Sequence, residues 1–202
     1  TKTENIFLKA KCESLERSMK ILIDEQKWEY SAPDIPVSHW DERGFDEDFI
    51  DEMKISVLDR IKQATCDLRN GVLNNEIIIL GDRDSDMILL HDDILLPHWK
   101  ELANAMQLYQ EEKPFTLSIF NVQLSTPVIA LLMPVLKHKS FETIDLQNNS
   151  FANVREGIEF AVEVIESNET IQGSWWTSNT INSIEDARYL VDSIIVHPSI
   201  DN

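Results

Sequence analysis

The chain has 202 residues, of which 43% are hydrophobic, which is enough for one large domain or two small ones. Asp and Glu together number 36 against 18 Lys and Arg, so the formal net charge is −18. Such a surface disfavours nucleic acid and anionic lipid, because binding to phosphate requires clustered basic side chains. The acidity favours a basic protein partner, or it serves only to keep the protein in solution.

Cysteine content and hydropathy bear on the compartment. Cys12 and Cys66 are too few for a disulfide framework, so an intracellular and by default cytoplasmic location is expected. No apolar run approaches the roughly 18 residues of a membrane-spanning helix, so no membrane insertion is expected. The polar N-terminus does not resemble a secretory signal, but the chain begins at Thr1 without Met, so import into an organelle stays open.

Residues 1–75 are expected to form a helical N-terminal region with two helices and a linker loop. In the first helix, residues 5–28, apolar positions recur in an a/d heptad pattern: Leu8, Cys12, Leu15, Met19 and Leu22. This pattern fits a coiled coil through which the chain self-associates, and it also fits a helix docked on its own domain. The second helix is predicted over 46–69, with Asp46 as its N-cap and a left-handed C-cap at Asn70-Gly71.

Residues 76–80, EIIIL, predict a buried strand, and the turn-like segment 81–86 separates it from a second apolar run at 87–90. These two runs predict a hairpin, which would cover the first edge of the sheet that follows.

From residue 87 onward the sequence repeats itself. An apolar pair recurs at steps of 29, 27 and 30 residues: Ile88/Leu90, Leu117/Ile119, Ile144/Leu146 and Ser174/Trp176. Three residues after each pair stand Asp93, Val122, Asn149 and Asn179, and two residues later stand Leu95, Leu124, Phe151 and Ile181. Each unit then continues into a segment with helical apolar spacing: 97–109, 127–138, 154–166 and 184–196.

The unit that begins at Phe141 has the most regular pattern. Its residues Phe141, Ile144, Leu146, Asn149 and Phe151 fill every position of L-x-x-L-x-L-x-x-N-x-L. Residues 86–202 therefore resemble a leucine-rich repeat of the ribonuclease-inhibitor-like class. The other units depart from the pattern at Ser174 and Trp176, at Val122, and at Asp93.

The resemblance implies an α/β fold: a leucine-rich-repeat solenoid of parallel strands with outer helices, preceded by the helical capping region. It would span 76–202, with the hairpin as N-terminal cap and about four repeats. Ile200 stands where another repeat would begin, so we expect the parent protein to continue beyond this C-terminus.

In such repeats the Asn side chain satisfies backbone groups where the chain leaves the strand. We therefore assign structural roles to the repeat positions Ile144, Leu146, Asn149, Phe151 and Asn179. Val122 has no side-chain amide, so its turn is expected to differ or to depend on its neighbours.

The resemblance also implies a concave face lined by strand residues that point away from the core. The partner-binding candidates on it are Phe120, Trp175, Phe115, His91, Asp145 and Gln147. Exposed aromatic side chains commonly dominate the energy of protein interfaces. Two alternatives remain: a shift by one residue would bury Trp175 and expose Trp176, and the N-terminal segment would cover Phe120.

No catalytic residue, metal site or cofactor is expected. The sequence has no G-x-S-x-G, P-loop or G-x-G-x-x-G motif. Asp82, Asp84 and Asp86 alternate as in a calcium loop, but Met87 replaces its Gly and Asp93 its Glu.

The sequence thus predicts a non-enzymatic module that binds a partner protein on the concave face of the repeats. One alternative is a structural or assembly subunit of a larger complex. The other is a regulatory solenoid that acts on an enzyme such as a small GTPase, by analogy with other proteins of this repeat class.

Overall fold

A computed structural model of the chain describes residues 28–36, 38, 48, 57–72, 76–80, 93–110 and 113–200. The chain divides into two compact units, Thr1–Tyr30 and Ser31–Asn202. In the first unit, the rings of Trp28 and Tyr30 meet edge to face with centroids 6.1 Å apart. The heptad leucines, Asp46, the predicted hairpin partner at 87–90 and His91 lie outside the described residues.

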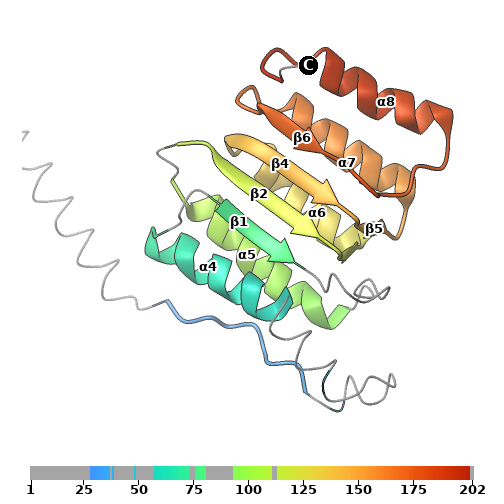
Figure 1. Ribbon diagram of the computed structural model, residues 1–202. Coiled ribbons are helices and arrows are strands. Elements are labelled where there is room, and N and C mark those ends of the chain that lie inside the picture. Colours follow the sequence, from blue (N-terminus) through green and yellow to red (C-terminus); the bar gives the residue numbers. More distant parts are fainter. Residues whose placement is uncertain are drawn as a thin grey trace, which may run out of the picture. The chain divides into compact units, whose positions relative to one another are not determined.

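The second unit has a parallel sheet at its centre (Figure 1). Its strands are β1 (Glu76–Leu80), β2 (Phe115–Phe120), β4 (Phe141–Gln147) and β6 (Gly173–Trp175), in that spatial order. All three neighbouring pairs are parallel. A second, two-stranded parallel sheet joins β3 (Gln123–Leu124) to β5 (Ser150–Phe151). The predicted α/β class with parallel strands is therefore confirmed.

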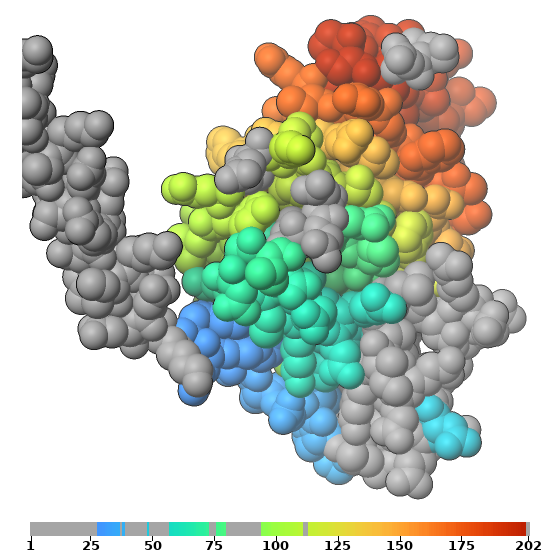
Figure 2. Space-filling view, turned by 60° about the vertical axis from the view of Figure 1, so that its left-hand side comes forward, coloured from blue at the N-terminus to red at the C-terminus, as the bar shows by residue number. Residues whose placement is uncertain are grey.

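Helices alternate with these strands along the chain. They are α4 (Asp59–Asn70), the 3₁₀ turn η2 (Asp93–Leu95), α5 (Leu96–Leu108), α6 (Thr126–Leu136), α7 (Val154–Glu166) and α8 (Ile184–Ile195). Helices α5, α6 and α7 lie behind the sheet in the view of Figure 1. Figure 2 shows that segments close in sequence also lie side by side, from α4 through to α8. The four helices predicted after residue 96 are confirmed within two residues at each end.

Local signals explain where several helices begin and end. Ser125, Asn153 and Ser183 cap α6, α7 and α8, because each side chain accepts a hydrogen bond from a backbone N–H of the first turn. Gly71 ends α4 in the left-handed conformation at φ 65°, as predicted for the C-cap.

The core lies between the sheet and the helices. Leu117 and Ile144 are register neighbours, as are Ile119 and Leu146, and all four side chains are buried. From the helices, the core receives buried side chains at helical spacing, among them Leu102, Met106, Leu132, Ile158 and Ile165. Fully burying an aliphatic side chain of this size contributes about 1.5–3 kcal/mol, so this continuous cluster accounts for much of the stabilisation.

The first strand of the sheet differs from the expectation. The repeat spacing predicted that Ile88, 29 residues before Leu117, lies beside Leu117 in the sheet. The register neighbour of Leu117 is instead Ile77, because β1 is the strand that pairs with β2 on the side away from β4. Ile77 and Ile79 supply the same apolar alternation, so a strand from farther back in the chain fills this place. The longer connection between β1 and β2 hides this pairing from a search for a constant step.

Candidate functional site

The chain leaves three strands through turns of the same geometry. Asn121, Asn148 and Ser178 follow β2, β4 and β6 and have φ values of 54°, 52° and 62°. The left-handed region is uncommon for residues other than glycine, and Asn enters it more readily than most. Asn148 N–H donates to the Thr177 carbonyl at 2.8 Å, and the Asn148 side chain donates to that of Asn121, so neighbouring turns are joined.

Two asparagine side chains bridge these turns to the sheet. Asn149 Nδ2 donates to the carbonyl of Ile119 at 2.7 Å, while its Oδ1 accepts from the N–H of Val122 at 3.1 Å. Asn179 Oδ1 accepts from the N–H of Asn149 at 2.6 Å, and Asn179 Nδ2 donates to the carbonyl of Leu146. The Val122 N–H is bonded by Asn149 just as the Asn149 N–H is bonded by Asn179, so the turn at Val122 does not differ from the next one. The turn that would receive a side-chain amide from position 122 follows β1 and lies outside the described residues.

The other predicted structural positions lie where the pattern places them. Ile144, Leu146 and Phe151 are all buried. Phe151 packs against Gly157 in α7, where a Cβ would stand 2.4 Å from two ring carbons. Gly157 therefore permits close packing between β5 and α7.

The other side of the sheet carries the residues that alternate with this core. We call it the Trp175 face and define it by Thr116, Ser118, Phe120, Thr143, Asp145, Gln147, Gly173 and Trp175. The register aligns Ser118, Asp145 and Trp175 in one row across three strands, and it aligns Phe120 with Gln147 in the next row. Four of the six partner-binding candidates thus share this face.

Trp175 is the most exposed aromatic residue described on this face. Its side chain is 55% exposed, and its indole Nε1 lies beside Gly173, 3.6 Å from where a Cβ would stand. The adjacent Trp176 is half-buried and stacks on Phe151, with ring centroids 5.1 Å apart and an interplanar angle of 11°. The alternative in which the two tryptophans exchange places is therefore wrong.

Asp145 lies beside Trp175 with an incompletely satisfied carboxylate. Gln147 Nε2 donates to Asp145 Oδ2 at 2.9 Å, whereas no donor from the described residues reaches the buried Oδ1. Burial raises the pKa of the Asp145 carboxyl above its usual range, and the hydrogen bond from Gln147 opposes part of this rise. A positive charge close to this carboxylate would therefore relieve part of the cost of its burial.

The remaining candidates differ in their placement. Ser118 is buried and Phe120 half-buried. Phe115 was predicted to face a partner, but it is 1% exposed and packs between Tyr109 and Phe141, with centroid distances of 6.4 Å and 4.7 Å. The prediction for Phe115 is wrong, because Phe115 alternates with Leu117 and Ile119 and therefore lies on the core side of β2. The register between β2 and β4 also shifts between Phe115 and Thr116. This shift makes Phe115 the neighbour of the core residue Phe141.

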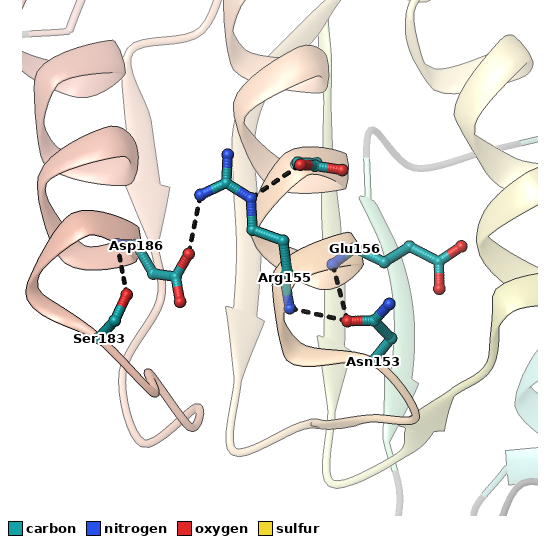
Figure 3. A network of polar contacts seen from close by, with 6 residues as sticks. Asn153, Arg155, Glu156, Ser183 and Asp186 are labelled. Atoms are coloured by element: carbon teal, nitrogen blue, oxygen red, sulfur yellow. Dashed lines mark hydrogen bonds and ion pairs between the residues drawn. The ribbon is translucent and has the colours of Figure 1, made fainter.

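The structure also joins polar residues that the sequence did not single out. Figure 3 shows Arg155 between α7 and α8: its Nη1 lies 2.8 Å from Asp186 Oδ1, and its Nε lies 2.7 Å from Glu159 Oε1. The hydrogen bond from Arg155 lowers the pKa of Asp186. The Arg155 guanidinium also lies over the ring of Tyr189, 4.8 Å from its centroid.

A second missed position is Asn168, in the turn after α7. Its Oδ1 accepts from the N–H of Phe141 at 3.3 Å, and its Nδ2 donates to the carbonyls of Leu136 and Val164. His197, in the turn after α8, contacts the Asn168 carbonyl through Nε2 at 2.8 Å. The sequence signal that could have indicated this position is a polar residue directly after each of two consecutive helices, Asn168 after α7 and His197 after α8.

The described residues contain no group of three or more His, Cys, Asp or Glu side chains that could hold a metal ion. Burial, with a smaller contribution from Asp67, raises the pKa of the Cys66 thiol, which lowers its thiolate fraction and its reactivity. In the same part of the chain, no helix has the length and apolar character needed to cross a membrane.

Comparison of the chain with protein-family models and with the curated proteins finds no match.

Proposed function

We propose that residues 76–200 form a short leucine-rich-repeat solenoid of the ribonuclease-inhibitor-like class. Three features support this: parallel strands in chain order, helices between them, and amide bridges at nearly constant spacing. The bonds from Asn149 and Asn179 to the preceding turn span 27 and 30 residues. Each unit then buries its apolar face only by packing against its neighbours.

We propose that this array binds another protein through the Trp175 face and has no catalytic role of its own. The observation that carries the proposal is the 55% exposed side chain of Trp175. A large aromatic side chain that leaves half its surface in water contributes little to the core, yet it is an effective anchor for a partner.

The chemistry beside Trp175 favours a basic group on the partner. Asp145 is its register neighbour and brings a carboxylate beside the indole. A guanidinium or ammonium group over the indole face would lie near this carboxylate, and both the ring and the negative charge favour a cation. The net charge of −18 would also steer a basic partner toward the protein.

Affinity purification from the source organism, with four versions of the full chain as bait, tests this function. The baits are the wild type, Trp175→Ala, Asp145→Asn and, as a control, Leu108→Ala. Leu108 is 64% exposed and lies on α5, away from the Trp175 face. The proposal expects a protein retained by the wild type and by Leu108→Ala but lost with both Trp175→Ala and Asp145→Asn.

Direct titration of that purified protein should then show an affinity at least about 10-fold weaker for Trp175→Ala than for Leu108→Ala. Equal affinity of all four versions would mean that the Trp175 face is not the binding surface.

A further inference from the structure

Helix α8 presents an apolar stripe to solvent. Ile184, Val191 and Ile195 recur at helical spacing and are 75%, 48% and 56% exposed, and Val196 follows at 74%. Two exposed charged residues, Arg188 and Asp192, lie within the same stripe. Apolar residues repeated along one exposed side of a helix are typical of an interface.

Helix α7 shows what covers such a stripe. Its cap, Asn153, corresponds to Ser183 of α8, and both caps accept from backbone N–H groups. Counted from the caps, the α7 residues Ile158, Ala161, Val162 and Ile165 are all buried, whereas their α8 counterparts Arg188, Val191, Asp192 and Ile195 are all exposed. Helix α7 has a neighbouring helix on each side, whereas α8 has one, α7, in the described part of the chain (Figure 1). The exposed stripe of α8 is thus the side on which a further helix would pack.

The two charged residues restrict what this further helix is. Where α7 has Ile158 and Val162, α8 has Arg188 and Asp192. An apolar helix packed on α8 would remove both charges from water and leave them only each other, one helical turn apart, as partners. The occupant that fits best therefore offers apolar groups and, beside them, an acidic group for Arg188 and a basic group for Asp192.

We propose that the occupant is α8 of a second copy of this chain, packed antiparallel about a two-fold axis. In a two-fold interface, residue i meets residue j and j meets i, so the surface must complement itself. The stripe does so: the register that sets Ile184 against Ile195 of the second copy also brings Arg188 beside Asp192 of that copy. The two-fold axis generates each contact twice. The interface would therefore have an Ile184–Ile195 contact at each end and two Arg188–Asp192 ion pairs, one on each side of the axis.

Reciprocal charge exchange in the full chain tests this pairing by sedimentation velocity. Arg188→Asp places a new carboxylate beside Asp192 of the second copy, and Asp192→Arg places a new guanidinium beside Arg188 of that copy. Each single variant should self-associate at least about 10-fold more weakly than the wild type, because like charges face each other. An equimolar mixture of the two single variants should form mixed dimers, and the double variant Arg188→Asp/Asp192→Arg should self-associate again.

Two controls locate the interface. Leu15→Glu alters the N-terminal heptads and should leave α8-mediated association unchanged, and Trp175→Ala should do the same. Circular dichroism and thermal melting check that every variant is folded, and exposed substitutions of this kind change stability by little.

Three outcomes would each overturn the proposal. The wild type could stay monomeric at concentrations up to about 100 μM, which would leave α8 to a further repeat of its own chain or to a different protein. Association could persist unchanged in both single variants. It could also be abolished by Leu15→Glu, which would assign it to the heptads.

Discussion

Asn179 Oδ1 accepts the backbone N–H of Asn149 at 2.6 Å, and Asn149 Oδ1 in turn accepts the backbone N–H of Val122 at 3.1 Å. Each asparagine therefore fixes the turn that precedes it in the sheet, and each turn depends on the strand that follows. Under the proposed solenoid, this dependence couples the stability of one unit to that of the next.

Replacing Asn149 with Ala should lower the free energy of unfolding by about 2–4 kcal/mol, because it leaves two buried backbone groups unpaired. These groups are the N–H of Val122 and the carbonyl of Ile119. Urea denaturation followed by circular dichroism measures the change. Asn182→Ala is the matched control, since Asn182 is exposed and its substitution should cost less than about 0.5 kcal/mol. Equal stability of the two variants would contradict the structural role of Asn149.

The elements that the sequence predicted well are those defined by local chemistry. Helix α7 begins and ends at the predicted residues, because Asn153 caps it and its apolar residues recur at helical spacing. The bridging roles of Asn149 and Asn179 were implied by the resemblance to a leucine-rich repeat, whose pattern places an Asn three residues after the second strand position, and both side chains make such bonds. Such features depend on residues near one another or at a constant step along the chain.

The misplaced features depend on irregular steps. A constant step of 27 residues aligned Phe115 with the exposed Glu142, but the register shifts after Phe115 and pairs it with the core residue Phe141. Alternation with the buried Leu117 and Ile119 places Phe115 on the core side as well. The longer connection after β1 made Ile77 the neighbour of Leu117 in place of Ile88. The Arg155–Asp186 ion pair could not be predicted either, since no local pattern links two charges that lie 31 residues apart on different helices.

Substituting Gly157 with Ala should destabilise the protein by about 1–3 kcal/mol through overpacking, although Ala is the better helix former by about 1 kcal/mol. The added Cβ would stand 2.4 Å from Cγ and Cδ1 of Phe151, and Cγ moves away only if χ1 leaves its rotamer or the backbone shifts. The same substitution at Gly173, where contacts start at 3.6 Å, should have a much smaller effect.

Combining Gly157→Ala with Phe151→Leu provides an internal check. The double variant should lose less stability than the two single losses added together, because the smaller side chain relieves the overlap. Strict additivity in urea denaturation would mean that Phe151 is not what Gly157 accommodates.

His98 should make stability depend on pH near neutrality. The His98 side chain is buried in α5. Burial, with a smaller contribution from Lys62, lowers the pKa of His98 from 6.5. A hydrogen bond with the backbone of Pro33 and the charges of Asp34 and Glu101 oppose part of this shift. The unfolded chain therefore binds more protons at His98 than the folded chain below pH 6.5. Stability is at its full value above that pH and falls as the pH drops toward the folded pKa.

The slope from this one group is at most about 1.4 kcal/mol per pH unit. Denaturation of wild type, His98→Gln and His138→Gln between about pH 5 and 7.5 measures it. His138 is exposed, so His138→Gln should keep the wild-type slope, and His98→Gln should flatten it. Identical slopes in all three proteins would rule out a buried neutral His98.

Truncation to Ala should affect the stability of the protein at Trp176 but hardly at Trp175. Trp176 stacks on the buried Phe151, so Trp176→Ala removes packing and should cost about 3 kcal/mol. Trp175 is 55% exposed, so Trp175→Ala should change stability by less than about 0.5 kcal/mol while weakening partner binding. Thermal melting and urea denaturation of both variants decide the point. A large loss of stability in Trp175→Ala would make that residue part of the core, and the proposal that it anchors a partner would lose its basis.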